Sequence, residues 1–231
     1  MLMNKQTKII ATVGPGMLEF KTFQAVAQEA NFLRINTAYA TKEQYDMVLE
    51  HLKKARVKNI EIMLDIRNAR ALNDWLKYPF QMVAISFAET AKQVQEIQSM
   101  APDKKIISKI ETKKGVQNFK EILENSWGVM VARGDLGEAV TLEKVPCLQK
   151  KLAKQTLEKN KFLIIATEML LSMVNKSAPT RAEVSDVANA VFENACAVML
   201  SEETAIGNYP AEAVNYMKRI VREAEQCVFV K

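Results

Sequence analysis

The sequence predicts an α/β fold, specifically a (β/α)8 TIM barrel, and three observations point to it. Short apolar runs rich in Val, Ile and Phe recur with amphipathic segments between them, which is the pattern of repeated βα units and a parallel sheet. Eight such runs can be counted, the number that a closed barrel requires. The 231 residues can bury one large core and leave no segment for a second domain. We therefore expect a single barrel domain over residues 1–231.

Each apolar run is expected to form a buried parallel strand, because β-branched and aromatic side chains favour strands. In the first half of the chain the predicted strands are TKIIATVG (7–14), NFLRINTA (31–38), NIEIMLDI (59–66) and QMVAISF (81–87). In the second half they are KKIISKI (104–110), WGVMVAR (127–133), FLIIATE (162–168) and ACAVMLS (195–201).

Helical periodicity fills the segments between these strands. Examples are KTFQAVAQEA (21–30) after the first strand and AEAVNYMKRIVREAEQ (211–226) after the last. Two helix starts can be placed: Thr180 is a predicted N-cap with Glu183 as its capping-box partner, and Pro210 lies in a first turn. We interpret both as structural signals.

The net charge of +5 arises from 32 basic and 27 acidic residues. The basic residues are spread along predicted helices among acids, without interleaved aromatic residues that could stack on RNA. We therefore expect a solvated basic surface and no nucleic-acid partner. A mild positive field also suits an anionic small substrate.

The N-terminal segment MLMNKQTK does not resemble a cleavable signal, and no apolar run approaches the roughly 20 residues needed to cross a bilayer. We expect a cytoplasmic protein without a membrane partner. Cys147, Cys196 and Cys227 are odd in number and lack metal-ligand spacing, so we interpret them as small apolar fillers.

Polar side chains gather where the predicted strands end. In a (β/α)8 barrel the active site lies at the C-terminal ends of the strands, so these residues are the candidates to weigh. Because residues i and i+2 of a strand project the same way, Lys109 and Glu111 should point together, as should Arg34 and Asn36. The strand-end residues, in chain order, are Arg34, Asn36, Asp65, Lys109, Glu111, Arg133, Asp135, Thr167, Glu168 and, nearby, Glu203.

Glu111 and Asp135 follow neighbouring strands and could hold one hard cation, leaving its other positions to water and substrate oxygens, as Mg²⁺ prefers. Lys109 beside them would stabilise negative charge on a bound oxygen. Gly134 and Gly137 would let backbone N–H groups approach an anionic ligand such as a carboxylate, and Thr167 could hydrogen-bond across the site.

The alternative is that these charges only pair with one another, Lys109 with Glu111 or Asp135. Each residue taken singly is more often structural than catalytic. Convergence of an arginine, a lysine and two acids on one rim, however, is poor for stability alone and favours a site.

The chain resembles the pyruvate kinase family in its successive barrel motifs. The similarity covers nearly the whole chain, is strongest from Lys105 to Pro210, and is carried by IIATVGPG, LRIN, MLDI, KIISKIE, GVMVARGDLG, ATEMLLSM, PTRAEVSDVANAV and SEETAIGNYPAEAV. The resemblance implies a phosphoenolpyruvate- or pyruvate-binding barrel with Mg²⁺ or Mn²⁺ held by Glu111 and Asp135. It implies that Lys109 stabilises the phosphoryl group and the enolate, that Arg34 meets phosphate, that Thr167 contacts substrate, and that the backbone of Gly134 and Asp135 receives a carboxylate.

The sequence departs from the family's pattern around the nucleotide and the monovalent cation. The family inserts a lid domain after the third strand, where this chain has only NARALNDWLKYPF, and appends a C-terminal domain, which we do not expect here. Ala38 and Ile66 stand where hydroxyl ligands of K⁺ belong, which argues against a K⁺ site. Tyr39 and Ile206 replace residues that resemble nucleotide contacts, and Arg70 is a stand-in for a phosphate-binding arginine.

The residues implied for the metal, the carboxylate and the enolate are present, while those for the nucleotide and the monovalent cation are altered. Three hypotheses follow from this pattern. The first is a metal-dependent enzyme that binds pyruvate, phosphoenolpyruvate or oxaloacetate and works through a pyruvate enolate as a carbon–carbon lyase, decarboxylase or condensing enzyme. The second is a minimal pyruvate kinase that phosphorylates ADP. The third is a non-catalytic barrel that acts as a binding or scaffold protein. We also expect homo-oligomers formed through the outer face of the barrel.

Overall fold

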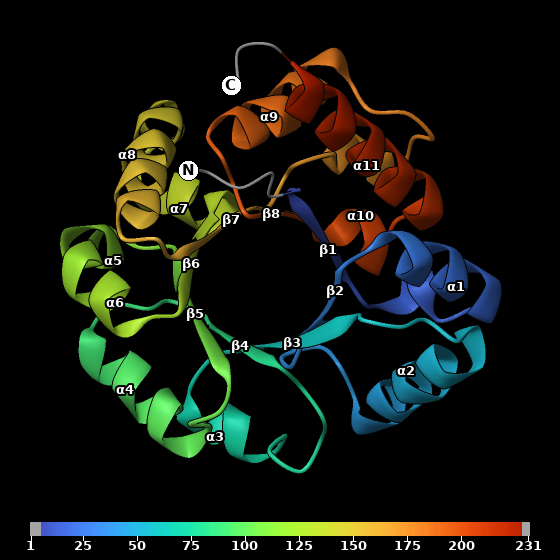
Figure 1. Ribbon diagram of the computed structural model, residues 1–231, viewed down its shortest axis with the longest axis horizontal. Helices are drawn as coiled ribbons and strands as arrows, with labels where there is room; N and C mark the ends of the chain where they lie inside the picture. The colour runs from blue at the N-terminus through green and yellow to red at the C-terminus, as the bar shows by residue number, and fades with distance from the viewer. Residues whose placement is uncertain (1–5, 228–231) are drawn as a thin grey trace. The chain divides into compact units, whose positions relative to one another are not determined.

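The computed structural model describes residues 6–227, and its strands form a closed parallel barrel in chain order, β1 to β8 (Figure 1). The first residues of the MLMNKQTK segment, 1–5, lie outside the described part. The strands are β1 (Lys8–Thr12), β2 (Phe32–Asn36), β3 (Glu61–Ile66), β4 (Met82–Ile85), β5 (Lys105–Ile110), β6 (Gly128–Ala132), β7 (Phe162–Ala166) and β8 (Ala197–Leu200). All eight lie within the predicted ranges, so the predicted barrel is confirmed.

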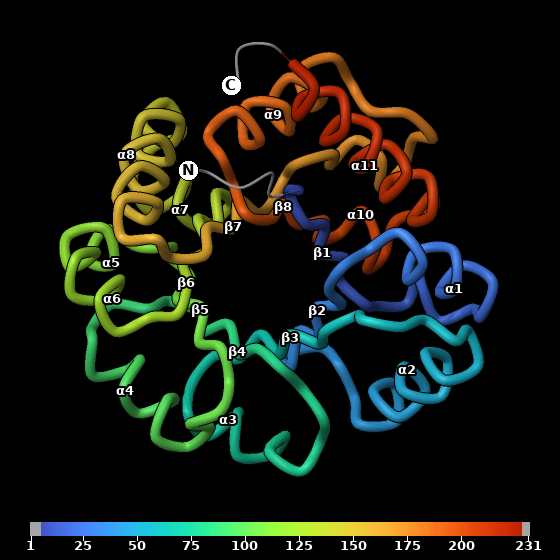
Figure 2. Tube along the Cα trace, in the orientation of Figure 1, coloured from blue at the N-terminus to red at the C-terminus, as the bar shows by residue number. Residues whose placement is uncertain are grey.

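Helices follow the strands along the chain, as the trace in Figure 2 shows. The α-helices are α1 (Phe20–Glu29), α2 (Lys42–Ala55), α3 (Ala69–Asn73), α4 (Ala91–Met100), α5 (Lys113–Gln117), α6 (Phe119–Asn125), α7 (Arg133–Val140), α8 (Val145–Glu158), α9 (Arg181–Phe192), α10 (Glu202–Ala205) and α11 (Pro210–Gln226). Within residues 6–227, three short 3-10 helices complete the order: η1 (Pro15–Met17), η2 (Leu142–Lys144) and η3 (Leu171–Val174).

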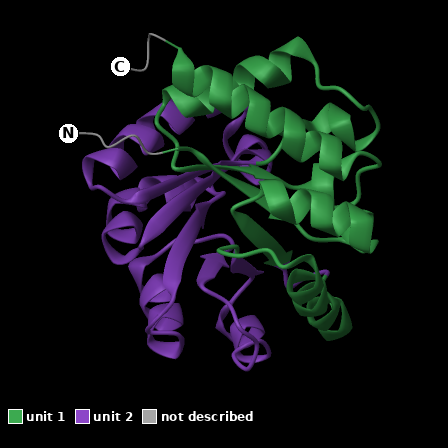
Figure 3. Cartoon of the chain, turned by 45° about the vertical axis from the view of Figure 1, so that its right-hand side comes forward, with its two compact units in different colours: residues 1–35, 40–60, 167–231 green, residues 36–39, 61–166 purple. Residues whose placement is uncertain are grey.

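The chain divides into two compact units, coloured separately in Figure 3. Unit 1 comprises residues 1–35, 40–60 and 167–231, and within it β1 pairs with β2 and with β8. Unit 2 comprises residues 36–39 and 61–166, and within it β3 to β7 pair in sequence. The single-domain assignment over residues 1–231 stays a prediction.

Both units are built on strands that are buried almost throughout. In unit 1, Ile10, Leu33 and Leu200 have no exposed surface, and in unit 2 the same holds for Leu64 and Ile107. Burial on both faces explains why the strands read as continuous apolar runs in the sequence. A polar residue at the end of such a strand is therefore conspicuous.

Helix starts follow the predicted side-chain chemistry. The Thr180 side chain accepts from the Glu183 N–H and the Glu183 side chain from the Thr180 N–H, so the predicted capping box opens α9. Pro210 lies in the first turn of α11, also as predicted. Cys196 is buried, but Cys147 is exposed, so its interpretation as an apolar filler is wrong. Over residues 6–227, none of the helices combines the length and the apolar character that a membrane span requires.

Candidate active site

A buried ionic cluster lies where β3 and β5 of unit 2 end. The Lys109 Nζ is 3.1 Å from Asp65 Oδ2 and 3.0 Å from Glu111 Oε1. Exposure of the three residues is only 7% for Lys109 and 2% for each acid. The predicted common direction of Lys109 and Glu111 is thus confirmed, and Asp65 joins them from β3.

Ser86 and Phe87, directly after β4, complete the cluster. The Ser86 hydroxyl donates to Asp65 Oδ1 at 2.9 Å and accepts from Lys109 Nζ at 3.1 Å. The Phe87 N–H donates to Glu111 Oε2 at 2.7 Å. Sequence reasoning missed both residues because they were assigned to the apolar strand 81–87. A serine at the carboxyl end of that strand was the available signal.

The cluster buries charged groups of both signs. One ammonium faces two carboxylates, and all three groups are almost wholly removed from water. Burial raises the pKa of Glu111 above its ordinary value, while the Lys109 ammonium and the Phe87 N–H oppose that rise. A second cation beside Glu111 would offset the remaining cost of burying its charge.

Asp135 and Gly134 lie in the first turn of α7, which begins directly after β6. The prediction that strand six extends to Arg133 is wrong, because Arg133 already begins this helix. The side chain of Asp135 is exposed, and the helix dipole favours an anion at this end. Because β5 pairs with β6 through Ile110 and Val131, Glu111 and the start of α7 follow adjacent strand ends.

The donor set fits a hard divalent cation. Carboxylate oxygens are the ligands that Mg²⁺ and Mn²⁺ prefer, and one or two carboxylates with water suffice for Mg²⁺. Each Glu111 oxygen accepts one hydrogen bond, from Lys109 or from Phe87, so lone pairs remain for an ion. Among the described residues, no group of three or more His, Cys, Asp or Glu side chains gathers as a metal site.

The turn after β2 belongs to unit 2 and is attached to Asp65. Thr37 donates its N–H and its hydroxyl to the Asp65 carbonyl, at 3.0 and 2.8 Å. Asn36 Oδ1 accepts from the Ala38 N–H at 3.2 Å, which forms a local turn. Tyr39 is 84% exposed at the tip of this turn. Asn36 is thus engaged in the turn itself.

Arg70 and Arg133 are two further candidates of unit 2. Arg70 is exposed on the short helix α3. Arg133 Nε donates to the carbonyl of Ala166, the last residue of β7, at 3.3 Å. This contact ties the start of α7 to a neighbouring strand, and a role of Arg133 in ligand binding stays a prediction.

Arg34 and Thr167 belong to unit 1. Arg34 is buried, and its Nη1 donates to the Thr12 hydroxyl at 3.1 Å, which in turn donates to the Leu200 carbonyl at 2.8 Å. Thr167 has φ 68° and Glu168 has φ 55°, so the chain leaves β7 through two left-handed residues. For a β-branched threonine this conformation is unusual and typical of functional or strained turns.

Glu203, a further candidate, is a fully buried residue of unit 1. Its Oε1 accepts from the Leu170 N–H at 2.9 Å and its Oε2 from the Ser201 N–H at 2.7 Å. Burial raises the pKa of Glu203, while these backbone donors oppose the rise. The carboxylate links the segment after β7 to the segment after β8. Ile206, beyond it, is 59% exposed.

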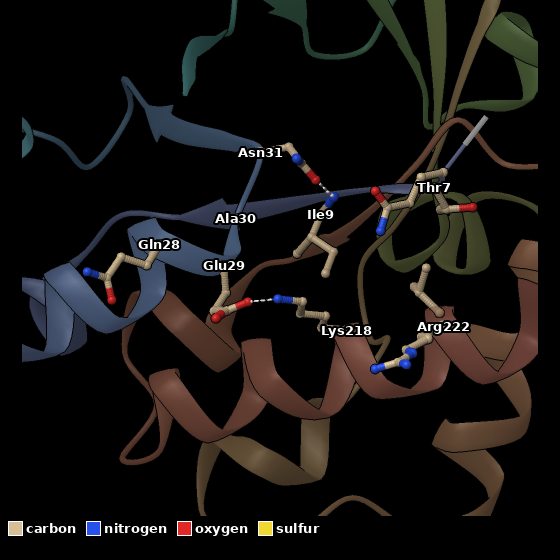
Figure 4. A pocket seen from close by; sticks show the side chains of 10 residues that line it. Thr7, Ile9, Gln28, Glu29, Ala30, Asn31, Lys218 and Arg222 are labelled. Carbon is tan, nitrogen blue, oxygen red and sulfur yellow. Dashed lines mark hydrogen bonds and ion pairs between the residues drawn. The ribbon is translucent and has the colours of Figure 1, made fainter. Parts of the chain in front are cut away.

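A cavity of about 220 Å³ in unit 1 is lined by Thr7 and Asn31, which directly precede β1 and β2, so it lies at the amino ends of these strands. Figure 4 shows Lys218 paired with Glu29 and the Ile9 N–H donating to Asn31 beside the start of β1. In a (β/α)8 barrel the amino ends of the strands serve stability rather than catalysis. We do not assign this cavity a catalytic role.

Comparison with known proteins gives one consistent result. A family model described as pyruvate kinase, barrel domain, matches residues 64–214. The chain is 42% identical over 183 residues to a pyruvate kinase of Chlamydia muridarum, covering 75% of this chain and 38% of the relative. It is 48% identical over 141 residues to one of Thermoplasma acidophilum and 51% identical over 147 residues to one of Dictyostelium discoideum. Those alignments cover 26% and 29% of the relatives, so this chain matches well under half of their length.

Proposed function

Because this chain belongs to the pyruvate kinase family, we propose that it binds a small 2-oxo acid or enolpyruvate with Mg²⁺ or Mn²⁺ and stabilises the enolate of pyruvate. The reaction we assign to that enolate is carbon–carbon cleavage, decarboxylation of oxaloacetate or condensation. Glu111 and Asp135 would hold the metal, and the first turn of α7 at Gly134 and Asp135 would receive the carboxylate of the ligand.

The position of the Lys109 ammonium carries the proposal. It lies at the carboxyl end of β5, held within 3.2 Å of two buried acids and a serine hydroxyl. Replacing buried ion pairs by apolar side chains is often neutral or stabilising, so stability alone gives little reason to bury these charges together. Such a preorganised positive charge is what a developing enolate oxygen requires.

The chain's own residues would have separate roles in this reaction. When bound, the divalent ion supplies positive charge to the oxygens of the ligand. Lys109 would face the enolate oxygen, and Asp65 and Ser86 would hold the ammonium in place. For Arg34 and Thr167, contacts with the ligand stay predictions from the family resemblance.

The connection between β3 and β4 bears on the choice of reaction. Only residues 67–81, with the short helix α3, join these strands. The resemblance implies a lid domain at this position, and phosphoryl transfer depends on positioning a nucleotide and excluding water. Enolate formation does not require a positioned nucleotide, so the short connection favours a lyase-type reaction.

The experiment follows the methyl protons of pyruvate in D2O with Mg²⁺ or Mn²⁺ by NMR. We expect catalysed deuterium uptake that Lys109→Met abolishes. The matched control is Lys105→Met, four residues earlier on the same strand, where Lys105 pairs with Glu61. Equal exchange in both variants, or none in the native protein, would overturn the proposal, and the second result would favour a non-catalytic binding barrel.

A second candidate function is phosphoryl transfer from phosphoenolpyruvate to ADP. The names of the curated relatives favour it, as do the retained Lys109, Glu111 and Asp135. A coupled assay with phosphoenolpyruvate, ADP and Mg²⁺ separates the two. Turnover to ATP would establish the kinase, whereas deuterium uptake without ATP would leave the enolate chemistry alone.

A further inference from the structure

We propose that Phe87 is a positioning residue for Glu111 and that it acts through its backbone, not through its ring. The inference rests on the proposed function, because it gives the Phe87 N–H the task of fixing a metal-binding carboxylate. Phe87 donates this N–H to Glu111 Oε2 at 2.7 Å, and its own φ is 52°. Phe87 as a whole is 40% exposed.

The backbone N–H groups of Ser86, Phe87 and Ala88 all donate hydrogen bonds to residues of the cluster or of the strands that carry it. Ser86 donates to the Ile66 carbonyl at 2.9 Å, Phe87 to the Glu111 carboxylate, and Ala88 to the Lys109 carbonyl at 3.2 Å. Successive N–H groups of an extended strand point to opposite sides. Two neighbouring N–H groups can both face residues of the β5 segment only because the chain turns at Phe87.

The chain turns there because Phe87 adopts a positive, left-handed φ. Glycine adopts a positive φ without steric cost, most side chains resist it, and β-branched side chains resist it most. Phenylalanine at this position is therefore held in an unfavourable conformation by its surroundings. Strain of this kind, located beside a charged cluster, is typical of functional sites.

The bond fixes the carboxylate on the side that Lys109 does not reach. Lys109 contacts Oε1 at 3.0 Å and Phe87 contacts Oε2, so both oxygens of Glu111 are oriented. Hydrogen bonds to a liganding carboxylate typically change metal affinity by about 10- to 100-fold when removed. Phe87 would therefore act on metal binding without touching the ion.

The test compares Phe87→Gly with Phe87→Val in the full chain. Both variants delete the ring and keep an N–H, and they differ in how readily the backbone adopts a positive φ. The readout is the dissociation constant for Mn²⁺, from the electron paramagnetic resonance of the free ion, with circular dichroism as the check on folding. We expect Phe87→Gly to bind Mn²⁺ like the native protein and Phe87→Val to bind about 10-fold or more weakly.

Each outcome either supports or contradicts the inference about Phe87. Equal weakening in both variants would assign the effect to the ring and overturn the inference, and so would native affinity in both. If Phe87→Val does not fold, Phe87→Ala replaces it: native affinity supports a backbone role, and weaker binding contradicts it. A native protein that binds no Mn²⁺ overturns the proposed function together with this inference, whereas a binding native protein with unchanged variants overturns the inference alone.

Discussion

Two buried glutamates differ in the groups that they contact. Glu111 contacts a lysine ammonium and one backbone N–H, at the end of a strand that carries a second charged residue. Glu203 accepts from the backbone N–H groups of Leu170 and Ser201. We propose that the first carboxylate serves a ligand, while the second ties two chain segments together.

The raised pKa of Glu203 makes a pH-dependent contribution to stability. Because the folded chain holds the Glu203 proton more tightly than the unfolded chain, stability falls as pH rises from the ordinary value of 4.5 through the raised pKa. As pH rises through this range, we expect the free energy of unfolding of the native protein to fall relative to that of Glu203→Gln. Urea titrations at several pH values measure it, with Glu212→Gln, an exposed position on α11, as control. Parallel curves for the native protein and Glu203→Gln would contradict this account.

At the scale of elements, helix α5 packs against the turn that carries Phe87. Thr112 caps α5 by accepting from the Gly115 N–H, and its hydroxyl donates to Glu89. A Cβ on Gly115 would lie 2.7 Å from the Ala88 carbonyl oxygen. Only glycine allows this close approach, so the helix and the turn constrain each other.

Gly115→Ala should destabilise the protein even though alanine is the better helix former. We expect a loss of about 1–3 kcal/mol, the usual cost of overpacking, because backbone must move. The matched control is Gly137→Ala in α7, where the closest contact of a Cβ among the described residues would be Val145, at an ordinary 3.6 Å. That variant should keep its stability or gain up to about 1 kcal/mol. Differential scanning calorimetry compares the two, and equal melting temperatures would refute the packing argument.

The strands were predictable because burial on both faces leaves an unbroken apolar run, as in KKIISKI. The pairing of Lys109 with Glu111 was predictable from their two-residue spacing. The contribution of Phe87 was not, because a backbone N–H leaves no mark in the sequence and a phenylalanine gives no hint of positive φ. The helical start at Arg133 was missed because the predicted strand, WGVMVAR, was continued to Arg133.

At the scale of the whole molecule, the surface carries large apolar side chains that water does not favour. Leu142, between α7 and α8, is 74% exposed, and Phe192, at the end of α9, is 42% exposed. Exposed apolar patches on stable proteins commonly mark contacts with another chain. The homo-oligomer, in which a symmetric partner would cover such positions, stays a prediction.

Light scattering coupled to gel filtration tests the oligomer directly. At micromolar concentration we expect a mass that is a multiple of the 26.1 kDa chain. Leu142→Ser should shift that mass toward one chain if the α7–α8 connection takes part in the interface. A native mass equal to one chain would refute the prediction.

The central claim is that Glu111 helps to bind a divalent ion at the carboxyl ends of the unit 2 strands. Calorimetric titration of the native protein with Mn²⁺ tests it, beside Glu111→Gln and, as control, Glu124→Gln on the exposed face of α6. We expect about one ion per chain in the native protein and in Glu124→Gln, and binding reduced by about 10-fold or more in Glu111→Gln. Uptake that is absent from the native protein, or unchanged in Glu111→Gln, would contradict the claim.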